Sequence, residues 1–199
     1  NVFVVKEEVH DTTEYRWARG WPPHSKPKSI GRNIFLNMIK SRSIMNNILD
    51  EHEHKTNTKY DRVIFSRMDV HYKSNKAKGK TGPYSDVPLV FTPFNDYIDG
   101  LDMKYVWLPH FHHWGGGYND RFAIGTRENM RHYFSLYDNI DLYKGKIVFQ
   151  AENLLKYHID RTPIKDKIKI CWLPFCRIRS TGKHRDDWDD VFEATDMPK

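Results

Sequence analysis

Cysteine is scarce in this sequence, and long hydrophobic runs are absent. The 199 residues include only two cysteines, Cys171 and Cys176. Both fall within a segment that we predict to be a strand, where an odd spacing points side chains to opposite faces, so we expect no disulfide between them. Residence in a reducing, intracellular compartment is the expectation. Since no apolar stretch approaches the roughly 20 residues that a membrane-spanning helix needs, we expect no membrane span.

The composition fits one folded domain with an anionic partner. Hydrophobic residues make up 39% of the chain and charged residues 29%, so wholesale disorder is not expected. We expect residues 1–199 to form a single domain with a sizeable core. Asn1 is not a natural start, which leaves open that this domain was cut from a longer polypeptide. The net charge of +6 favours partners such as nucleotides and sugar phosphates.

The most informative segment is Tyr60–Tyr72, with the sequence YDRVIFSRMDVHY. The apolar run at positions 63–65 predicts a strand that is buried on both faces. Arg67, Asp69 and His71 follow at alternate positions, so an extended chain would place them on one side. In open α/β sheets, ligands bind beside the carboxyl ends of the strands. The segment therefore predicts a binding site at the end of a central strand.

This group of a cation, a carboxylate and an imidazole has two interpretations. In the first, Asp69 and His71 are ligands of a divalent metal, and Arg67 binds an anionic group. In the second, the residues are a solvated strand end in which Arg67 and Asp69 pair with each other. The segment alone does not decide between them.

The remaining segments predict an alternation of strands and helices. Hydrophobic periodicity predicts a helix over about residues 30–52, between a strand at Asn1–Val5 and the strand in Tyr60–Tyr72. This β–loop–α–β unit indicates an α/β fold. We interpret Glu152 as a first-turn carboxylate that a helix dipole favours. Further elements are predicted as strands at 87–92, 105–108, 122–124 and 168–178, and as helices after Thr126 and at 149–159.

A second polar block, HFHHWGGGYND, spans residues 110–120. Its histidines lack the spacing of known zinc motifs, so a structural zinc site is not the favoured interpretation. Gly116 and Gly117 belong to a glycine run that lets a ligand approach the main chain. Asn119 and Asp120 follow, and an amide beside a carboxylate suits the binding of sugar hydroxyls or acid–base chemistry.

A basic cluster follows the predicted strand at 168–178. Within it, Arg179 and Lys183 are candidates for clamping a diphosphate, and His184 is a candidate metal ligand. The alternative is a solvated tail whose charge is balanced by the aspartates at 186–190.

The order of these blocks resembles a known enzyme family. R-x-D-x-x-Y follows a YD-x-V-I strand, and then come G-G-x-N-D-x-F-A-I-G, an E-x-L-L-K-Y-H helix and a terminal R-I-R segment. This series is similar to small GT-A-type glycosyltransferases, in particular the single-domain enzymes of large algal DNA viruses that glycosylate a capsid protein. The resemblance covers roughly residues 60–185 and is carried by the order and spacing of the blocks.

The resemblance implies a Rossmann-related fold with a central mixed, mostly parallel sheet flanked by helices. It implies a hexosyltransferase that moves a sugar from a UDP-sugar donor to a glycan or glycoprotein acceptor, in the cytoplasm of the host cell if the protein is viral. Mn²⁺ or Mg²⁺ would bridge the diphosphate. Asp69 and His71 match the family's Asp-x-Asp metal motif, and the imidazole favours Mn²⁺. Asn119 and Asp120 match the family's segment that faces the donor sugar. His184 matches a histidine near the end of the chain that completes metal coordination in related enzymes.

Two other function classes fit some of the same residues. A nucleic-acid-binding module is compatible with the basic charge and the 14% aromatic content, but acidic residues are interleaved and no nucleic-acid motif is present. A metal-dependent phosphoester hydrolase would use the same aspartate and histidine residues. We expect sugar transfer, with Asp69 on the metal, Arg179 and Lys183 on the diphosphate, and Asp120 in sugar binding or catalysis.

Overall fold

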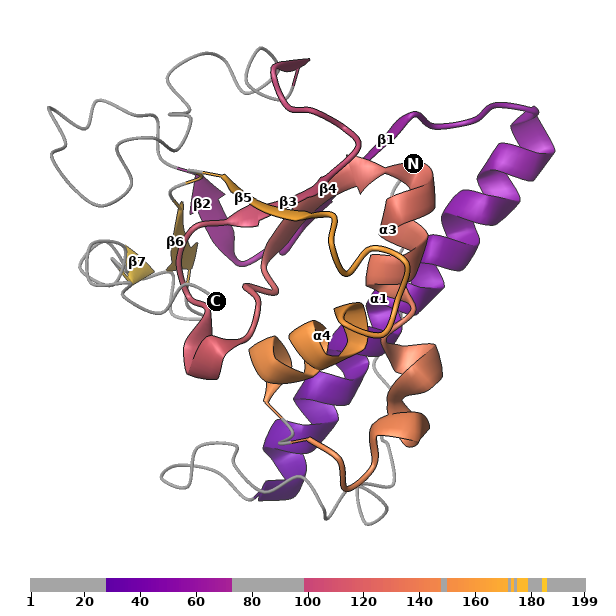
Figure 1. Ribbon diagram of the computed structural model, residues 1–199. Coiled ribbons are helices and arrows are strands. Elements are labelled where there is room, and N and C mark those ends of the chain that lie inside the picture. The colour runs from indigo at the N-terminus through magenta and orange to yellow at the C-terminus, as the bar shows by residue number, and fades with distance from the viewer. Residues whose placement is uncertain are drawn as a thin grey trace, which may run out of the picture.

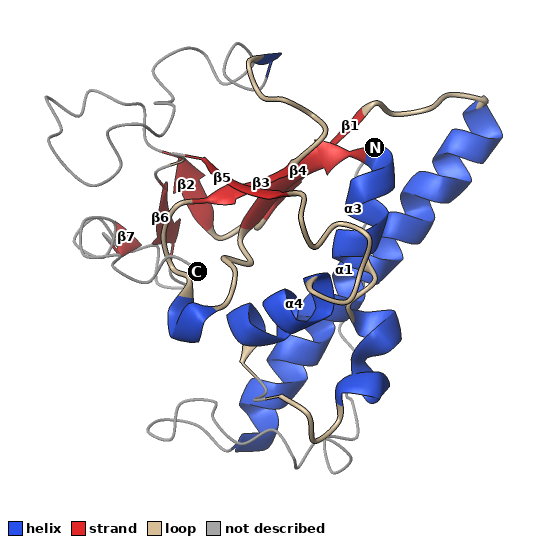
Figure 2. Cartoon of the chain, in the orientation of Figure 1, coloured by secondary structure: helices blue, strands red, loops and turns tan. Residues whose placement is uncertain are grey.

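The computed structural model describes residues 28–72, 99–147, 150–171, 173, 175–178 and 184–185. A long helix, α1 (Lys28–Thr56), runs beneath a small sheet, and the other helices gather on the same side of that sheet (Figures 1 and 2). The later elements are β1 (Arg62–Ser66), β2 (Val70–Tyr72), β3 (Val106–Pro109), the 3-10 turn η1 (Trp114–Gly116), β4 (Phe122–Thr126), α3 (Arg127–Phe134), the 3-10 segment η2 (Tyr137–Tyr143), α4 (Ala151–Ile159), β5 (Ile168–Cys171), β6 (Phe175–Ile178) and β7 (His184–Arg185).

Helix α1 confirms the predicted helix and extends it at both ends. Phe35, Leu36 and Ile39 are buried and pack into the main core. Ile34 and Met45, two of the apolar residues whose spacing predicted the helix, are instead 55% and 37% exposed. The helix is followed by Asn57 at a φ of 50°, a left-handed conformation that commonly ends helices. The predicted strand at Asn1–Val5, which would precede this helix, lies outside the described residues.

The described strands form two sheets. The larger has the order β1-β4-β3-β5, and the smaller has the order β2-β6-β7. In the larger sheet only β3 and β5 are parallel, while β1–β4 and β3–β4 are antiparallel. The fold is therefore mixed α/β with a small mixed sheet, but the prediction of a mostly parallel sheet is wrong for these strands. Between β3 and β4 the chain returns through residues 110–121, which hold a 3-10 turn instead of the long helical crossover that parallel neighbours need.

The predicted strand through Tyr60–Tyr72 is two strands in different sheets. Strand β1 ends at Ser66, and β2 starts at Val70 and pairs with β6. Arg67 and Asp69 therefore lie in the turn between sheets, and they do not line one face of a strand. Strand β1 is also the outermost described strand of its sheet, where Ile64 is 44% exposed, so burial on both faces was wrongly predicted.

Most of the other element predictions on described residues are confirmed. Strands β3 and β4 confirm the predicted strands at 105–108 and 122–124, and α4 confirms the helix predicted at 149–159. Thr126 caps α3 as expected, because its hydroxyl accepts a hydrogen bond from the backbone N–H of Asn129 at 3.2 Å. The strand predicted at 168–178 divides into β5 and β6 in different sheets, and the strand predicted at 87–92 lies outside the described residues.

Two groups of apolar side chains cover the faces of the larger sheet. The main core joins α1, α3 and α4 to the face that carries Phe65, Leu108 and Ala123. A smaller group covers the opposite face around Phe122 and Ile124. Within the described ranges, no helix is both long enough and apolar enough to cross a membrane.

Gly117 brings η1 against the first turn of α4. A methyl group at this position would lie 2.2 Å from the backbone carbonyl carbon of Glu152. The neighbouring Tyr118 donates its backbone N–H to the carbonyl oxygen of Glu152 at 3.0 Å. The glycine thus fixes where α4 begins relative to the loop before β4.

We expect Gly117→Ala to destabilise the protein by more than about 2 kcal/mol, because α4 must move away from the added methyl group. Gly116→Ala is the matched control. No atom lies within 4 Å of its added methyl group, so only the left-handed φ of +76° opposes the change, at about 1 kcal/mol. Urea unfolding of both variants measures the difference, and equal losses would contradict the close approach.

Candidate functional site

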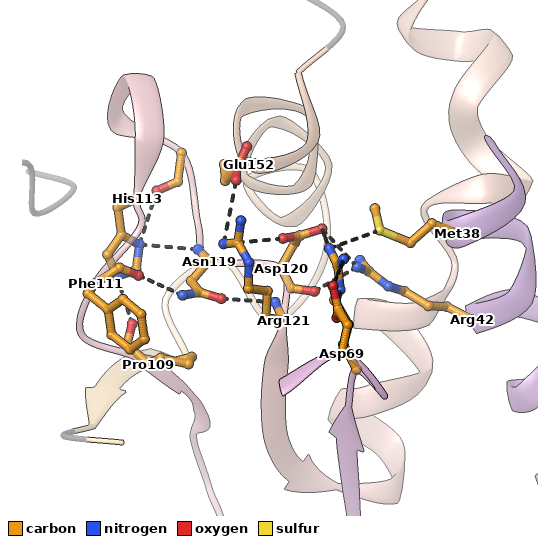
Figure 3. Close-up of polar contacts among 12 residues, drawn as sticks. Met38, Arg42, Asp69, Pro109, Phe111, His113, Asn119, Asp120, Arg121 and Glu152 are labelled. Carbon is orange, nitrogen blue, oxygen red and sulfur yellow. Dashed lines mark hydrogen bonds and ion pairs between the residues drawn. The ribbon is translucent and has the colours of Figure 1, made fainter. Parts of the chain in front are cut away.

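Three arginines and three carboxylates lie together where α1, the loop before β4 and the first turn of α4 meet (Figure 3). We call this group the arginine–carboxylate cluster. Its members are Arg42 from α1, Arg67 and Asp69 from the turn after β1, Asp120 and Arg121 from the residues before β4, and Glu152 from α4.

Asp120 occupies the centre of the cluster, and its side chain is only 2% exposed. Arg42 donates from Nη2 to the carboxylate Oδ2 at 3.1 Å and to the backbone carbonyl oxygen of Asp120 at 2.7 Å. Arg67 Nη1 is 4.0 Å from Oδ2, and Arg121 Nη1 is 3.9 Å from Oδ1. Burial works against the charge of the carboxylate, but the three arginines outweigh it and lower the pKa of Asp120. Asp120 is therefore ionised.

Arg42 is as deeply buried as the apolar residues that surround it. It lies on the face of α1 that carries Ile39, and its guanidinium stands 4.7 Å from the ring centre of Phe65 and 5.9 Å from that of Tyr133. The rings accept the cation through their negative faces, while Asp120 supplies the opposite charge. Arg42 was not among the predicted site residues. The sequence signal that could have found it is a charged residue at an apolar-face position of the predicted helix.

Arg67 and Asp69 form the exposed end of the cluster. Arg67 donates from Nε to Oδ1 of Asp69 at 2.8 Å and from Nη2 to Oδ2 at 2.7 Å, a bidentate pair. The two side chains are 28% and 39% exposed, respectively. The ion pair of the second interpretation is therefore present, and it engages both carboxylate oxygens of Asp69.

Metal binding has little support from the described residues. Among them, no group of three or more His, Cys, Asp or Glu side chains is arranged to hold an ion. The guanidinium of Arg67 occupies one lone pair on each oxygen of Asp69, so an ion there would have to share the carboxylate with it. Arg179 and Lys183 lie outside the described residues, as do the side chains of His71 and His184. Strand pairing places both histidines in the smaller sheet, where they flank β6 from β2 and β7.

Asn119 supports the loop that carries Asp120. Its Nδ2 donates to the carbonyl oxygen of Phe111 at 2.6 Å, and its Oδ1 accepts from the N–H of Arg121 at 2.9 Å. His113 also braces this loop. Its Nε2 lies 2.8 Å from the carbonyl oxygen of Pro109, and its Nδ1 lies 3.2 Å from the carbonyl oxygen of Gly117 and 3.3 Å from the backbone nitrogen of Asn119. Burial lowers the pKa of His113, although the two carbonyl contacts favour a protonated ring.

Glu152 lies in the first turn of α4, as predicted, and it also reaches into the arginine–carboxylate cluster. Its side chain is 8% exposed, and Oε1 lies 3.8 Å from Arg121 Nη1. Burial and the charge of Asp120 raise the pKa of Glu152 to about 7. Two carboxyl groups therefore share one arginine but differ in ionisation, a pattern typical of sites that exchange protons. Neither Glu152 nor Arg121 was among the predicted site residues.

The structure brings together three of the predicted site residues, Arg67, Asp69 and Asp120. Gly117 lies against Glu152, and Gly116 lies in the exposed turn η1. Comparisons with protein-family models, with curated proteins and with solved structures found no match to this chain. The chemistry of the site has to be argued from its own geometry.

A separate open groove lies at the carboxyl end of α1. Its charged side chains are engaged with one another: Arg127 Nε is 3.1 Å from Glu53 Oε2, and Arg131 pairs with Asp50. These pairs join α1 to α3, which is a structural role. The arginine–carboxylate cluster is the stronger candidate, because it combines buried charge, a shifted carboxyl pKa and an exposed end.

We expect Arg42→Met to cost about 3–5 kcal/mol of unfolding free energy, because it keeps the side-chain volume but leaves the buried carboxylate of Asp120 without its main partner. The control is Lys55→Met, which removes an exposed pair with Glu51 and should cost less than about 0.5 kcal/mol. Urea unfolding measures both. A loss below about 1 kcal/mol for Arg42→Met would show that the pair does not hold α1 in place.

Glu152→Gln should change how stability depends on pH. Because the pKa of Glu152 is raised from 4.5 to about 7, the folded protein binds more protons than the unfolded chain between these values, and its stability falls as pH rises through them. Glutamine removes this loss, which is on the order of 3 kcal/mol. The free energy of unfolding of the variant, relative to that of the unaltered protein, should therefore be higher at pH 8 than at pH 5. A relative free energy that does not change with pH would contradict the raised pKa.

Proposed function

We propose that the protein is a GT-A-type glycosyltransferase, which moves a hexose from a UDP-sugar to a glycan or glycoprotein acceptor. The observation that carries the proposal is the partly exposed Arg67–Asp69 pair, whose arginine also lies next to the buried charge of Asp120. The proposal also draws on the order of the sequence blocks, three of which contribute residues to this one cluster.

Glycosyl transfer needs positive charge at the departing diphosphate, where negative charge builds as the sugar leaves. Among the arginines of the cluster, Arg67 is the one exposed enough to touch a ligand directly. Its guanidinium is held by Asp69 and lies close to Asp120, so it is oriented before any ligand binds. Arg67 is thus the proposed contact for the diphosphate.

Asp120 acts in this proposal through the arginines. With 2% of its side chain exposed, it has no surface to offer a sugar hydroxyl, but its charge fixes Arg42, Arg67 and Arg121. We therefore assign it a positioning role in catalysis. Asn119, Gly116 and Gly117 contribute by shaping the loop beside the site.

The metal in this proposal rests on the resemblance. Mn²⁺ or Mg²⁺ would neutralise charge on the diphosphate, and its ligands would be Asp69, His71 and His184. Arg179 and Lys183 would add contacts to the phosphates. Arg67 engages both oxygens of Asp69, so the charge stabilisation in this proposal comes from Arg67.

Nothing in the described cluster favours the two alternative functions. A nucleic-acid-binding module needs basic side chains spread over an exposed face, whereas Arg42 and Arg121 are buried and matched by carboxylates. A phosphoester hydrolase would share Arg67 and Asp69, and it is recognised by free sugar phosphate or phosphate that accumulates whether or not an acceptor is present.

We expect UDP to bind the protein and Mn²⁺ to strengthen that binding, with GDP and CMP as nucleotide controls in titration calorimetry. Arg67→Gln should weaken UDP binding by about tenfold or more, because it removes a charged contact to the diphosphate.

The matched control is Arg62→Gln, an exposed arginine of β1 that pairs with Asp99 away from the cluster, and it should bind UDP as the unaltered protein does. Absence of binding for every nucleotide, at concentrations that detect a Kd of about 100 µM, would overturn the transferase proposal.

A further inference from the structure

Two buried carboxyl groups converge on one guanidinium nitrogen in the cluster. Arg121 Nη1 lies 3.9 Å from Oδ1 of Asp120 and 3.8 Å from Oε1 of Glu152 (Figure 3). All three side chains are at most 8% exposed. A carboxylate that loses or gains a proton at such a place changes the charge that its neighbours experience, because little water is present to screen it.

The surroundings of Glu152 are fixed by three elements. Asp120 and Arg121 face it from the loop before β4, and Arg67 acts on it from the turn after β1. Gly117, the residue after η1, faces the backbone of Glu152 and carries no charge. On α4 itself, Lys156 pairs with Asp160. The pKa of Glu152 is therefore set first by burial and then by the charges of Asp120 and Arg121.

The protonation state of Glu152 decides the net charge of the cluster. With Glu152 ionised, three arginines face three carboxylates, and the charges cancel. With Glu152 protonated, the same arginines face two carboxylates, and one positive charge is left over. An anionic ligand at Arg67 is bound better by the second state.

We propose that Glu152 is a proton-exchanging positioning residue, which takes up a proton from solvent when the cluster binds a nucleoside diphosphate at Arg67. The uptake leaves Arg121 to Asp120 and leaves the cluster with one net positive charge toward the ligand. The nature of the ligand rests on the proposed function. The step moves one proton from solvent to the carboxylate of Glu152, and no covalent bond to the ligand forms or breaks.

Burial and the charge of Asp120 place the pKa of Glu152 at about 7, so the carboxyl is divided between its two forms at neutral pH. Binding should therefore take up about half a proton at pH 7. By the reciprocity of linked equilibria, affinity for the diphosphate should rise as pH falls from 8 to 6, by up to about tenfold.

The first test is calorimetry of UDP binding at pH 7 in buffers of different ionisation enthalpy, which counts the protons taken up. The unaltered protein is compared with Glu152→Gln, so that protons bound by the phosphate itself, which titrates near pH 6, cancel in the difference. We expect the variant to take up about half a proton less, because glutamine has no proton to gain.

Glu53→Gln is the matched control. Glu53 is also a glutamate held by an arginine, with Arg127 Nε at 3.1 Å from Oε2. Burial opposes its charge, but hydrogen bonds from the N–H of Tyr60 and from Arg127 lower the pKa of Glu53, so it is already ionised at neutral pH. This variant should take up as many protons as the unaltered protein.

The second test needs neither a variant nor a ligand. Carbon-13 NMR of the labelled glutamate carboxyls in the unaltered protein should reveal one that titrates near neutrality, and titration of all of them near 4.5 would overturn the proposal. Equal proton uptake by Glu152→Gln and the unaltered protein would also overturn it.

Failure of UDP to bind would contradict the proposed function instead. Pyrophosphate then replaces UDP as the probe. Proton uptake with pyrophosphate that is lost in Glu152→Gln would keep the present proposal, and absence of pyrophosphate binding would overturn it as well.

Discussion

The buried ion pair between Arg42 and Asp120 is the interaction on which the candidate site depends. It joins residues 78 positions apart and holds α1 to the loop before β4 through both the carboxylate and the backbone of Asp120. A buried charge is tolerated only when a partner and hydrogen bonds compensate its lost hydration. Asp120 therefore cannot change its surroundings cheaply, and the aromatic rings of Phe65 and Tyr133 hold the arginine in the same place from the other side. The positions of Arg67 and Arg121 follow from this fixed negative charge.

The side chains of the cluster become more exposed with distance from the Arg42–Asp120 pair. Exposure rises from 2% at the side chain of Asp120 to 28% at Arg67 and 39% at Asp69. The inner charges are matched and rigidly placed, and the outer pair is close enough to water to meet a ligand. Such a gradient gives an exposed cation a fixed orientation without requiring that the ligand provide the ordering free energy. Asn119 and His113 are hydrogen-bonded within the loop before β4, and that loop sets the positions of Asp120 and Arg121.

Much of the local structure could be predicted from the sequence, because it depends on neighbours along the chain. The spacing of apolar residues between Ile34 and Leu49 predicted α1, and Thr126 marked the start of α3. Sheet membership could not be predicted in the same way. The pattern of Tyr60–Tyr72 indicates an extended chain, but the break after Ser66 arises from pairing with β4 on one side and β6 on the other. The antiparallel return of β4 likewise depends on a loop without a helical crossover, which periodicity does not reveal.

The residues of the candidate site also differ in whether the sequence could predict them. Arg67, Asp69 and Asp120 could be selected because they stand at the ends of apolar segments. Arg42, Arg121 and Glu152 could not, because each owes its importance to a partner distant in sequence or in another element. The raised pKa of Glu152 is the clearest case, since it results from burial beneath η1 together with the charge of Asp120.

One consequence concerns how a ligand is recognised. Because the oxygens of Asp120 are covered, a bound sugar would sense that charge only through the arginines, as a field and not as a hydrogen-bond acceptor. The buried cluster can therefore set the affinity for the anionic part of a ligand but cannot distinguish one arrangement of hydroxyl groups from another. Selection among sugars must come from exposed side chains at the rim, so charge recognition and sugar recognition are carried by separate sets of residues in this fold.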